Sequence, residues 1–541
     1  MGSKMDWSTS YVLLYSLTAV VLYFVGSAAI TYVSNSSKAR RLGARPAPAY
    51  PQPVWDLLGI RALRRIQKAD QEKVVPMHIL ERNAQMKELH GRDVHTYTLN
   101  VAGKTIIITS DPVNIQAMLA KQFHDFSLGS NRRGNFFPLL GNGIFTSDGK
   151  GWEHSRAMLR PSFARDQISD LDLEERHAKN LMRALPVAED GWTSETDLQI
   201  LFFRLTIDSS TEFLFGESVN SQINELPENL AAQASSSNKA RDEKNFAHAF
   251  DTAQLYLSKR GRLGPRYWLI NNAEFRKTCR QCHDFIDSYV RIALNPEVKA
   301  HELEKGSIKD KEKYVFLEEL ARQTQDPIEL RSQLLHILLA GRDTTASLLG
   351  WTFYLLARHP DVYVKLRQTI IETFGTFESS TSNITFAALK NCQYLQYVLN
   401  ETLRLFPVVP LNGRASTKDT TLPRGGGPDG QSPVFVPKDT DVGYSVYVMH
   451  RSANFWGEDC EEYKPERWSG RRPGWEYLPF NGGPRICLGQ QFALTSAGYA
   501  VVRLLQRFDE IQNLDPTPMR QNATLTACSN AGVRVRLHEA K

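Results

Sequence analysis

Cysteine and net charge are both scarce in this sequence, and each shortage excludes a class of protein. Six cysteines scattered over 541 residues are too few for a disulfide-stapled secreted domain, so we expect the bulk of the chain to face a reducing compartment. The formal net charge is only +6, and no lysine- and arginine-rich run is interleaved with aromatic residues, so we expect no nucleic-acid binding. The remaining composition, with 42% hydrophobic residues, is that of a globular chain with a sizeable core.

Charge is absent altogether from residues 11–33, an apolar run near the N-terminus. As a helix this run would reach roughly 34 Å, enough to cross the hydrocarbon of a bilayer with some tilt. A cleaved signal peptide is the alternative, but the run is longer than the usual signal core of roughly 7–15 residues, and no clear A-x-A site precedes the basic cluster. That cluster follows the run, so the positive-inside rule places the rest of the chain in the cytosol; it consists of Lys38, Arg40, Arg41 and Arg45.

Prolines between residues 46 and 53 predict a stiff, extended connector that separates the apolar run from the body of the chain. The body has mostly helical periodicity, but residues 97–109 alternate and turn at Ala102-Gly103, which predicts a β-hairpin, and residues 434–448 predict further short strands. We therefore expect a mostly α fold with small β-sheets, preceded by one transmembrane helix. The expected domains are a lumenal N-terminal tail (1–10), a transmembrane anchor (11–33), a basic, proline-rich connector (34–69) and one large catalytic domain (70–541).

A long helix is predicted to begin at Asp326 and Pro327, because aspartate caps a helix and proline suits its first position, and to end before Pro360. In its middle, Gly341, Asp343 and Thr344 interrupt an apolar pattern, although glycine and buried polar groups cost helix stability. One interpretation is a tolerated kink. The other is an acid and an alcohol placed together for general acid catalysis.

One cysteine, Cys487, lies in a glycine- and proline-rich loop, and a helical apolar pattern follows it. The thiol is therefore expected at the start of a helix, where unpaired N–H groups favour a thiolate. A single cysteine is more often a small buried hydrophobe. Here the spacing decides otherwise, because the loop resembles the haem-binding loop of the cytochrome P450 family, F-x-x-G-x-R-x-C-x-G. The matching residues are Phe480, Gly483, Arg485, Cys487 and Gly489.

The resemblance implies roles for several residues in holding haem. Cys487 would ligate the iron, Phe480 would cover the sulfur, and Arg485 would meet a haem propionate. Trp152 and Arg156 lie four apart, on one face of a helix; alone they would suggest a surface cation–π pair, but they match the family's propionate-binding helix.

The same resemblance implies functional roles for two further segments. Arg414 matches the family's basic residue that contacts a propionate. The segment at residues 340–344 matches the family's A-G-x-D-T, which implies that Gly341 makes room for dioxygen and that Asp343 and Thr344 supply protons.

Glu401 and Arg404 are three apart in a strongly apolar helix, which suggests a buried ion pair rather than an exposed one. Arg467, in a segment that resembles the family's P-E-R-F with tryptophan in place of phenylalanine, is the expected third partner. These residues are expected to support the haem loop rather than to react.

A competing motif is Cys279-x-x-Cys282-His283, formally the attachment pattern for covalent c-type haem. It lies in a helical pattern of the domain that we place in the cytosol. We interpret these residues as part of a helix and not as a haem site.

The sequence around these motifs is similar to the fungal cytochromes P450 that hydroxylate alkanes and fatty acids, notably at residues 140–161, 201–218, 421–430 and 481–494. The similarity implies a monooxygenase of the endoplasmic reticulum membrane, with haem b, with electrons from an NADPH-dependent flavoprotein reductase, and with cytochrome b5 as a further candidate donor. Its substrate would be an apolar long-chain molecule hydroxylated at its terminal carbon.

Two alternatives remain at this point. The same chemistry on a fungal secondary-metabolite intermediate would share every motif, and a membrane-anchored haem electron carrier would use the Cys279–His283 motif. The sequence does not distinguish alkane from fatty acid. Candidate pocket-lining residues, chosen by their position beside the motifs, are Phe136, Phe137, His336, Leu339, Ala340, Val408, Val409 and Leu411.

Overall fold

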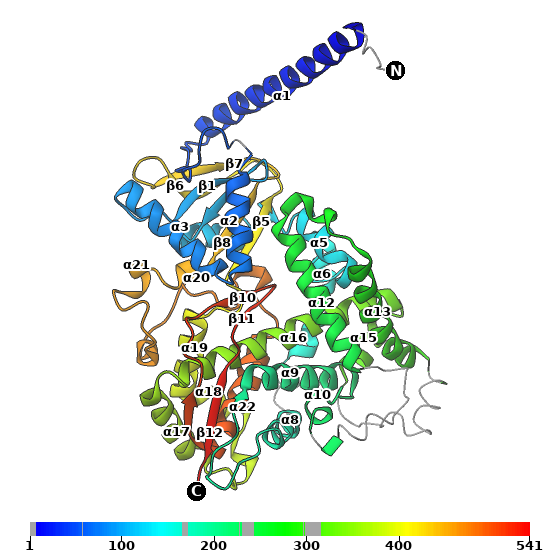
Figure 1. Ribbon diagram of the computed structural model, residues 1–541, viewed down its shortest axis with the longest axis vertical. Helices are drawn as coiled ribbons and strands as arrows, with labels where there is room; N and C mark the ends of the chain where they lie inside the picture. The colour runs from blue at the N-terminus through cyan, green and yellow to red at the C-terminus, as the bar shows by residue number, and fades with distance from the viewer. Residues whose placement is uncertain are drawn as a thin grey trace, which may run out of the picture.

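The computed structural model describes residues 7–56, 58–164, 171–226, 228–229, 243–295, 297 and 315–541. Over these residues the chain is mostly helical with small sheets, as predicted (Figure 1). The helices of eight residues or more are α1 (Trp7–Arg41), α2 (Ile60–Gln71), α3 (Val75–His90), α5 (Ser130–Leu140), α6 (Gly149–Leu159), α8 (Asp172–Arg183), α9 (Leu198–Phe215), α12 (Glu243–Arg262), α13 (Ala273–Leu294), α15 (Phe316–Gln323), α16 (Pro327–Leu356), α17 (Pro360–Phe374), α19 (Gln393–Leu405) and α22 (Gln490–Arg507).

Four small sheets accompany the helices. The largest has the strand order β1-β2-β8-β5-β3, and it contains the predicted hairpin, which turns at Ala102 and Gly103 with positive φ at both. The others are β4-β12-β9, β6-β7 and β10-β11. The strands are β1 (Thr96–Val101), β2 (Lys104–Thr109), β3 (Phe126–Ser127), β4 (Thr196–Asp197), β5 (Leu411–Ser416), β6 (Thr420–Gly426), β7 (Ser432–Val436), β8 (Asp441–Ser445), β9 (Phe508–Asn513), β10 (Gln521–Ala523), β11 (Ala527–Ser529) and β12 (Arg534–Glu539).

The predicted long helix is α16, which crosses the middle of the molecule (Figure 1). It starts as the sequence indicates: Asp326 Oδ1 accepts a hydrogen bond from the backbone N–H of Ile328 at 2.9 Å, and Pro327 occupies the first turn. Its first half, residues 330–339, packs into one apolar core with α9, α12, α13 and α15. Its second half, residues 346–356, packs into a larger core with α17, α19 and α22. The polar residues 341–345 therefore lie where the two cores meet.

The predicted buried ion pair is confirmed, and it ties α19 to the segment before the haem-type loop. Glu401 and Arg404 are fully buried, with Arg404 Nη2 2.8 Å from Glu401 Oε1, and Arg467 Nε approaches the same carboxylate at 3.3 Å. Trp468, the departure from the family pattern, donates from Nε1 to Glu401 Oε2 at 3.0 Å. The larger indole thus supplies a hydrogen bond that a phenylalanine ring lacks, which helps to satisfy a buried carboxylate.

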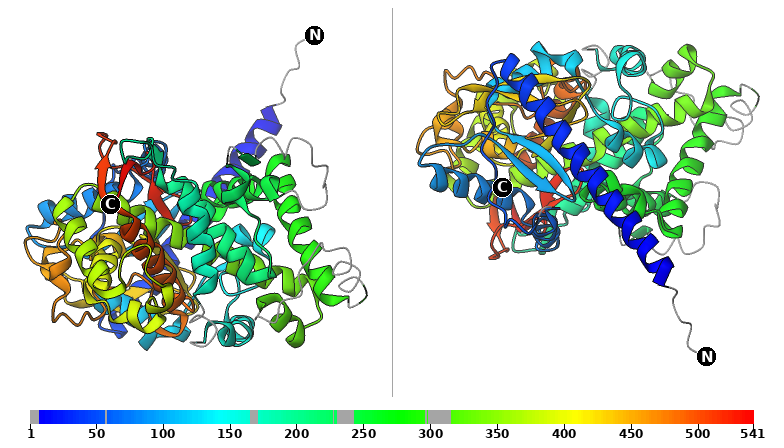
Figure 2. Two further views of the ribbon diagram at one scale, coloured as in Figure 1. Left: turned by 90° about the horizontal axis from the view of Figure 1, so that it is seen from below. Right: turned by 90° about the horizontal axis from the view of Figure 1, so that it is seen from above.

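Helix α1 projects away from the body, and most of its described side chains are exposed (Figures 1 and 2). Over Leu14–Arg41 it is long and apolar enough to cross a membrane. The predicted connector, residues 34–69, is helical at both ends, because α1 continues to Arg41 and α2 begins at Ile60. The described contacts between the end of α1 and the body include an exposed ion pair, Lys38 Nζ to Asp419 Oδ2 at 2.8 Å.

Two segments far apart in sequence expose large apolar side chains near this connector. We call them the apolar loop surface: Val54, Trp55, Leu58, Trp268 and Leu269, each more than half exposed. The segments lie side by side, because a Cβ built on Gly103 would be 3.5 Å from Leu58 Cδ2 and 4.0 Å from Arg266 Nη2. Exposed clusters of this kind mark contacts with membranes or partners.

Deleting residues 1–37 should leave the body folded, since the exposed Lys38–Asp419 pair contributes little to stability. We expect unchanged haem content and thermal-unfolding midpoint, together with loss of resistance to carbonate extraction from membranes. The shortened protein should still sediment with lipid vesicles, and the paired change Trp55→Ser and Trp268→Ser should release it. Carbonate resistance in the shortened chain would show that the anchor lies elsewhere.

Candidate functional site

The backbone of the loop at residues 480–489 adopts a conformation that depends on glycine at one position and on a hydrogen bond that closes the loop. The backbone N–H of Cys487 donates to the carbonyl of Phe480 at 3.0 Å, which closes the loop. Gly483 has φ 69°, and a Cβ there would lie 2.0 Å from the carbonyl oxygen of Leu119, so only glycine fits this approach. Phe480 packs against the larger core, and α22 begins three residues after Cys487, as predicted.

Two opposing influences act on the Cys487 thiol. Burial raises its pKa, while a hydrogen bond from the backbone of Gly489 and the positive charge of Arg156 lower it. Cys487 nevertheless retains accessible surface. A helix start and a nearby guanidinium are what a thiolate ligand requires.

Arg485 is fixed beside this thiol by the preceding loop and by α6. Its Nη2 donates to Asp148 Oδ1 at 2.7 Å and to the carbonyl of Ser147 at 3.1 Å, and its guanidinium carbon lies 4.4 Å from the centre of the Trp152 ring. Arg156 lies 5.8 Å from the same ring, and its Nη1 donates to the carbonyl of Ile486 at 3.0 Å. Trp152 is therefore a buried platform that holds both arginines against the loop.

Four arginines meet at this place: Arg132 on α5, Arg156 on α6, Arg414 on β5, and Arg485. The pKa of Arg485 is lowered to about 10, mainly by burial and also by the three other guanidiniums, while Asp148 opposes them. Burial and the charge of Arg414 likewise lower the pKa of Arg132 to about 10. One carboxylate near four like charges leaves the cluster strongly positive, so it suits an anionic ligand.

Arg132 belongs to this cluster but was not predicted. Its Nη1 donates to Asn412 Oδ1 at 2.9 Å, while its buried Nε has no partner. An unsatisfied buried donor beside other guanidiniums is the kind of group that a ligand would satisfy. No sequence motif marks Arg132, because its neighbours in space are some 280 positions away along the chain.

The donor set fits haem. A dianionic, flat group would find guanidiniums for both propionates, and its iron would find one thiol at Cys487. Within the described part of the chain, no cluster of three or more His, Cys, Asp or Glu side chains could hold a metal by itself. The buried guanidiniums and the thiol are what make this fit specific.

On α16 the two predicted catalytic residues have different surroundings. Thr344 is partly exposed, and its Oγ1 donates to the carbonyl of Ala340 at 2.5 Å. Asp343 is buried, contacts Arg342 Nη1 at 3.1 Å, and hydrogen-bonds to the Gln254 side chain. Burial raises the pKa of Asp343 to about 6, against the opposing charge of Arg342. A carboxyl of this kind can give and regain a proton near neutral pH.

Gly341 packs closely against α9, because a Cβ there would lie 3.0 Å from Ser210 Oγ. The glycine therefore permits close packing of two helices, and its expected role in making room for dioxygen stays a prediction. His336, a candidate pocket residue, is fully buried, with Nδ1 accepting from the backbone N–H of Phe145 at 3.3 Å. It supports the loop before α6 instead.

The competing Cys279–His283 motif is part of helix α13. Cys279 and Cys282 are buried, and burial raises the pKa of both thiols, to about 12 for Cys279. His283 Nε2 is 2.8 Å from the carbonyl oxygen of Leu139. These contacts are those of core residues.

Comparisons with known proteins identify the family and the fold of the chain. The family described as Cytochrome P450 matches residues 76–533. The chain is 50% identical to Cytochrome P450 monooxygenase g430 of a Fusarium species over 97% of this chain and 90% of the relative. It is 51% identical to Cytochrome P450 52A13 of Debaryomyces hansenii over 82% of this chain and 83% of the relative. A crystal structure of the cytochrome P450DA heme domain superposes with a TM-score of 0.69 and 20% identity, covering 92% of this chain and 97% of that one, which confirms the predicted fold.

Replacing Arg132 by leucine should weaken haem retention without unfolding the protein. A hydrogen bond to a charged group contributes roughly 1.5–3 kcal/mol, so haem transfer to a scavenger protein should be about tenfold faster or more. The haem-free protein should lose no stability, because one of several like charges is gone. Arg133→Leu, at the exposed neighbouring position, is the matched control. Equal haem transfer from both variants would remove Arg132 from the site.

Proposed function

This chain belongs to the cytochrome P450 family, and on that basis we propose that it hydroxylates the terminal carbon of a long-chain alkane or fatty acid. As a cytochrome P450 monooxygenase it uses haem with an axial cysteine thiolate and takes electrons from NADPH through a reductase. When bound, the haem supplies the chemistry that activates dioxygen and inserts one of its atoms into the substrate, while the other leaves as water.

The haem-holding roles are distributed over residues that the fold brings together. Cys487 provides the thiolate, and Phe480, whose carbonyl accepts from the Cys487 N–H, covers it. The arginine cluster would hold the propionates, and Trp152 supports two of its members, Arg156 and Arg485. The cluster consists of Arg132, Arg156, Arg414 and Arg485. What supports this assignment is the charge balance, since four guanidiniums with Asp148 as carboxylate partner call for an anionic ligand.

Asp343 and Thr344 deliver the protons that dioxygen cleavage needs. Asp343 can hold a proton near neutral pH because burial raises its pKa to about 6. Thr344 Oγ1, which donates to Ala340 in the present arrangement, is a hydroxyl that can accept one hydrogen bond while it donates another. The acid therefore stores the proton, and the alcohol orients its route on the side of α16 where Thr344 is partly exposed.

The membrane is the source of the apolar substrate. Helix α1 spans the membrane of the endoplasmic reticulum with the body in the cytosol, where the reductase and cytochrome b5 donate electrons. The apolar loop surface rests on the same bilayer, into which alkanes and fatty acids partition. The observation that carries the substrate class is the similarity over four fifths of the chain to a cytochrome P450 52A enzyme of a yeast, together with the local resemblances noted in the sequence.

A second candidate function is the same chemistry on a fungal secondary-metabolite intermediate. It is favoured by the relative from Fusarium, which matches nearly the whole chain at 50% identity and is named only as a monooxygenase. The electron-carrier alternative loses its support, because Cys279 and Cys282 are buried core residues.

Turnover of a mixed panel separates the two candidates. Membranes containing the protein and a reductase, given n-alkanes and fatty acids of graded length together with polycyclic and polyketide-type compounds, should yield terminal alcohols from the linear chains. Mass analysis of the products reads out both the substrate class and the position of oxygen. Exclusive turnover of the cyclic compounds would contradict the proposal and favour the second candidate.

Changing Thr344 to alanine should uncouple oxygen reduction from product formation. The loss of one hydroxyl leaves electron uptake intact but disturbs proton delivery, and general acid assistance is typically worth ~10²–10⁴-fold. NADPH consumption should persist while hydrogen peroxide rises and hydroxylated product falls. Thr344→Ser, which keeps the hydroxyl, should retain much of the coupling. An unchanged ratio of product to NADPH in Thr344→Ala would place the proton route elsewhere.

A further inference from the structure

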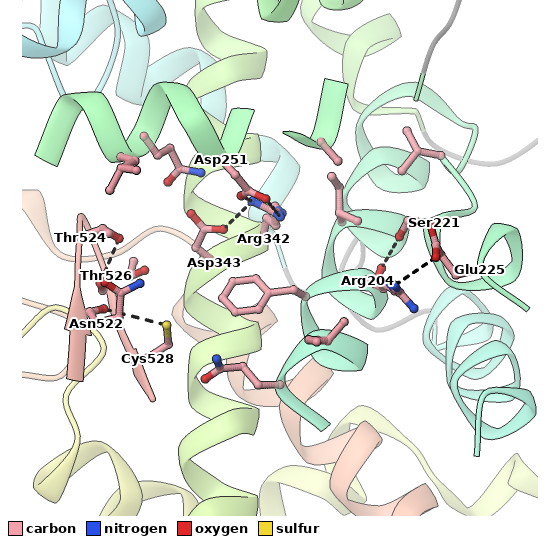
Figure 3. A pocket seen from close by; sticks show the side chains of 18 of the residues that line it. Arg204, Ser221, Glu225, Asp251, Arg342, Asp343, Asn522, Thr524, Thr526 and Cys528 are labelled. Atoms are coloured by element: carbon pink, nitrogen blue, oxygen red, sulfur yellow. Dashed lines mark hydrogen bonds and ion pairs between the residues drawn. The ribbon is translucent and has the colours of Figure 1, made fainter. Parts of the chain in front are cut away.

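A cavity of about 570 Å³ lies beside Asp343, and its lining also includes the more exposed Asp251; Figure 3 shows the side chains that line it. Helices α9, α12 and α16 and the β10–β11 hairpin form its walls. Its lining combines polar side chains, among them Gln254, Thr526 and Cys528, with apolar ones such as Phe203 and Ile207. A cavity of this size with several polar groups in its wall has room for water. The residues that we place around the haem do not line it.

Arg342, beside Asp343, shares its single charge between two carboxylates. Both of its terminal nitrogens contact Asp251 on α12, Nη2 at 3.1 Å from Oδ2, while Nη1 also lies 3.1 Å from Asp343 Oδ1 (Figure 3). The guanidinium is further held against the rings of Phe203 and Phe250. With both carboxylates ionised the cluster carries one net negative charge.

The two carboxylates differ sharply in exposure, and this decides which one takes up a proton. The Asp251 side chain is 55% exposed, whereas that of Asp343 is 8% exposed. Desolvation disfavours the charged form of the buried group. The charge of Asp251 adds to this effect, and both raise the pKa of Asp343. Asp343 is therefore the member that holds the proton.

The other charged groups that line the cavity do not change which of the two carboxylates takes up the proton. Arg204 on α9 faces Glu225, with 3.6 Å between Nη2 and Oε2, so they largely compensate each other. Cys528 on β11 has a pKa raised to about 12, mainly by burial, so its thiol is neutral. Among the described cavity residues, Asp251 is thus the carboxylate that competes with Asp343 for Arg342.

We propose that the Arg342–Asp251 ion pair is a latch that controls how readily Asp343 holds its proton. The inference rests on the proposed role of Asp343 as proton donor. Asp251 is a positioning residue: by occupying Arg342 it keeps that charge from stabilising the Asp343 carboxylate.

The ion pair joins two elements, because Asp251 belongs to α12 and Arg342 to α16. While Arg342 is shared between both carboxylates, Asp343 keeps its proton. Without the Asp251 charge, the whole charge of Arg342 would favour the Asp343 carboxylate.

The test replaces Asp251 by asparagine in the full-length holoenzyme. Arg342 then pairs with Asp343 alone, so Asp343 should lose its proton about one pH unit lower, at the small end of the effect of an adjacent opposite charge. In the resting protein, the infrared carbonyl band of the protonated Asp343 carboxyl, identified by its loss in Asp343→Asn, should titrate at that lower pH. The pH above which the ratio of product to NADPH declines should shift in the same direction. Asp251→Glu should restore both values.

Glu225→Gln is the matched control, since it removes a carboxylate from the same cavity that pairs with Arg204 and not with Arg342. It should leave the infrared titration and the pH profile where they are. Haem content verifies that each variant is folded.

The outcomes distinguish the proton-donor role of Asp343 from the effect of Asp251 on that role. A normal coupling ratio in Asp343→Asn would overturn the proton-donor role itself, whatever Asp251 does. Uncoupling in Asp343→Asn, combined with an unshifted infrared titration and pH profile in Asp251→Asn, would overturn the latch and leave the proposed function standing. A shift in Glu225→Gln equal to that in Asp251→Asn would also overturn it, because the effect would then be general to cavity charge.

Discussion

The repulsion among four buried or half-buried arginines is the constraint on which the rest of the structure depends. Arg132, Arg156, Arg414 and Arg485 come from three separate elements and one loop, and Asp148 is the carboxylate that the arrangement holds against them. Like charges in a dense interior are costly unless an opposite charge joins them. A dianionic cofactor would offset that cost and, by binding the folded state alone, would stabilise the fold. Trp152 and the Gly483 turn keep the guanidiniums and the thiol on one surface, whether or not the ligand is bound.

Helix α16 also carries buried charged groups, and it accommodates them by its position between two apolar cores. Its two halves are apolar and belong to separate cores, and the polar segment lies at the junction, where the helix can carry an ionisable group without breaking either core. Close packing of Gly341 on Ser210 holds the helix on α9 at this point. Asp343 is buried there, which raises its pKa, and it also lines a cavity.

Sequence reasoning located the features that depend on local spacing. Each of these features involves residues only a few positions apart, so periodicity and motifs are enough to find it. They are the Cys487 loop, the Trp152–Arg156 face, the capped start of α16, the hairpin at Gly103 and the Glu401–Arg404 pair. Features made by residues distant in sequence were missed or misjudged. Arg132 has no motif, the Arg342–Asp251 pair spans 91 positions, and the roles of Gly341 and His336 depend on what packs against them. The direction of a helical side chain toward a neighbouring element is set by tertiary packing, which a single sequence does not display.

The central claim is that the Cys487 thiolate is the ligand around which the arginine cluster and α16 are arranged. The most direct measurement is the absorption band that reduced, carbon-monoxide-bound thiolate haem displays, recorded for Cys487→Ser and for Cys282→Ala. The account predicts that the band disappears in Cys487→Ser and stays in Cys282→Ala, because Cys282 is a core residue. A band that survives in Cys487→Ser, or that is lost in Cys282→Ala with the protein still folded, would contradict it.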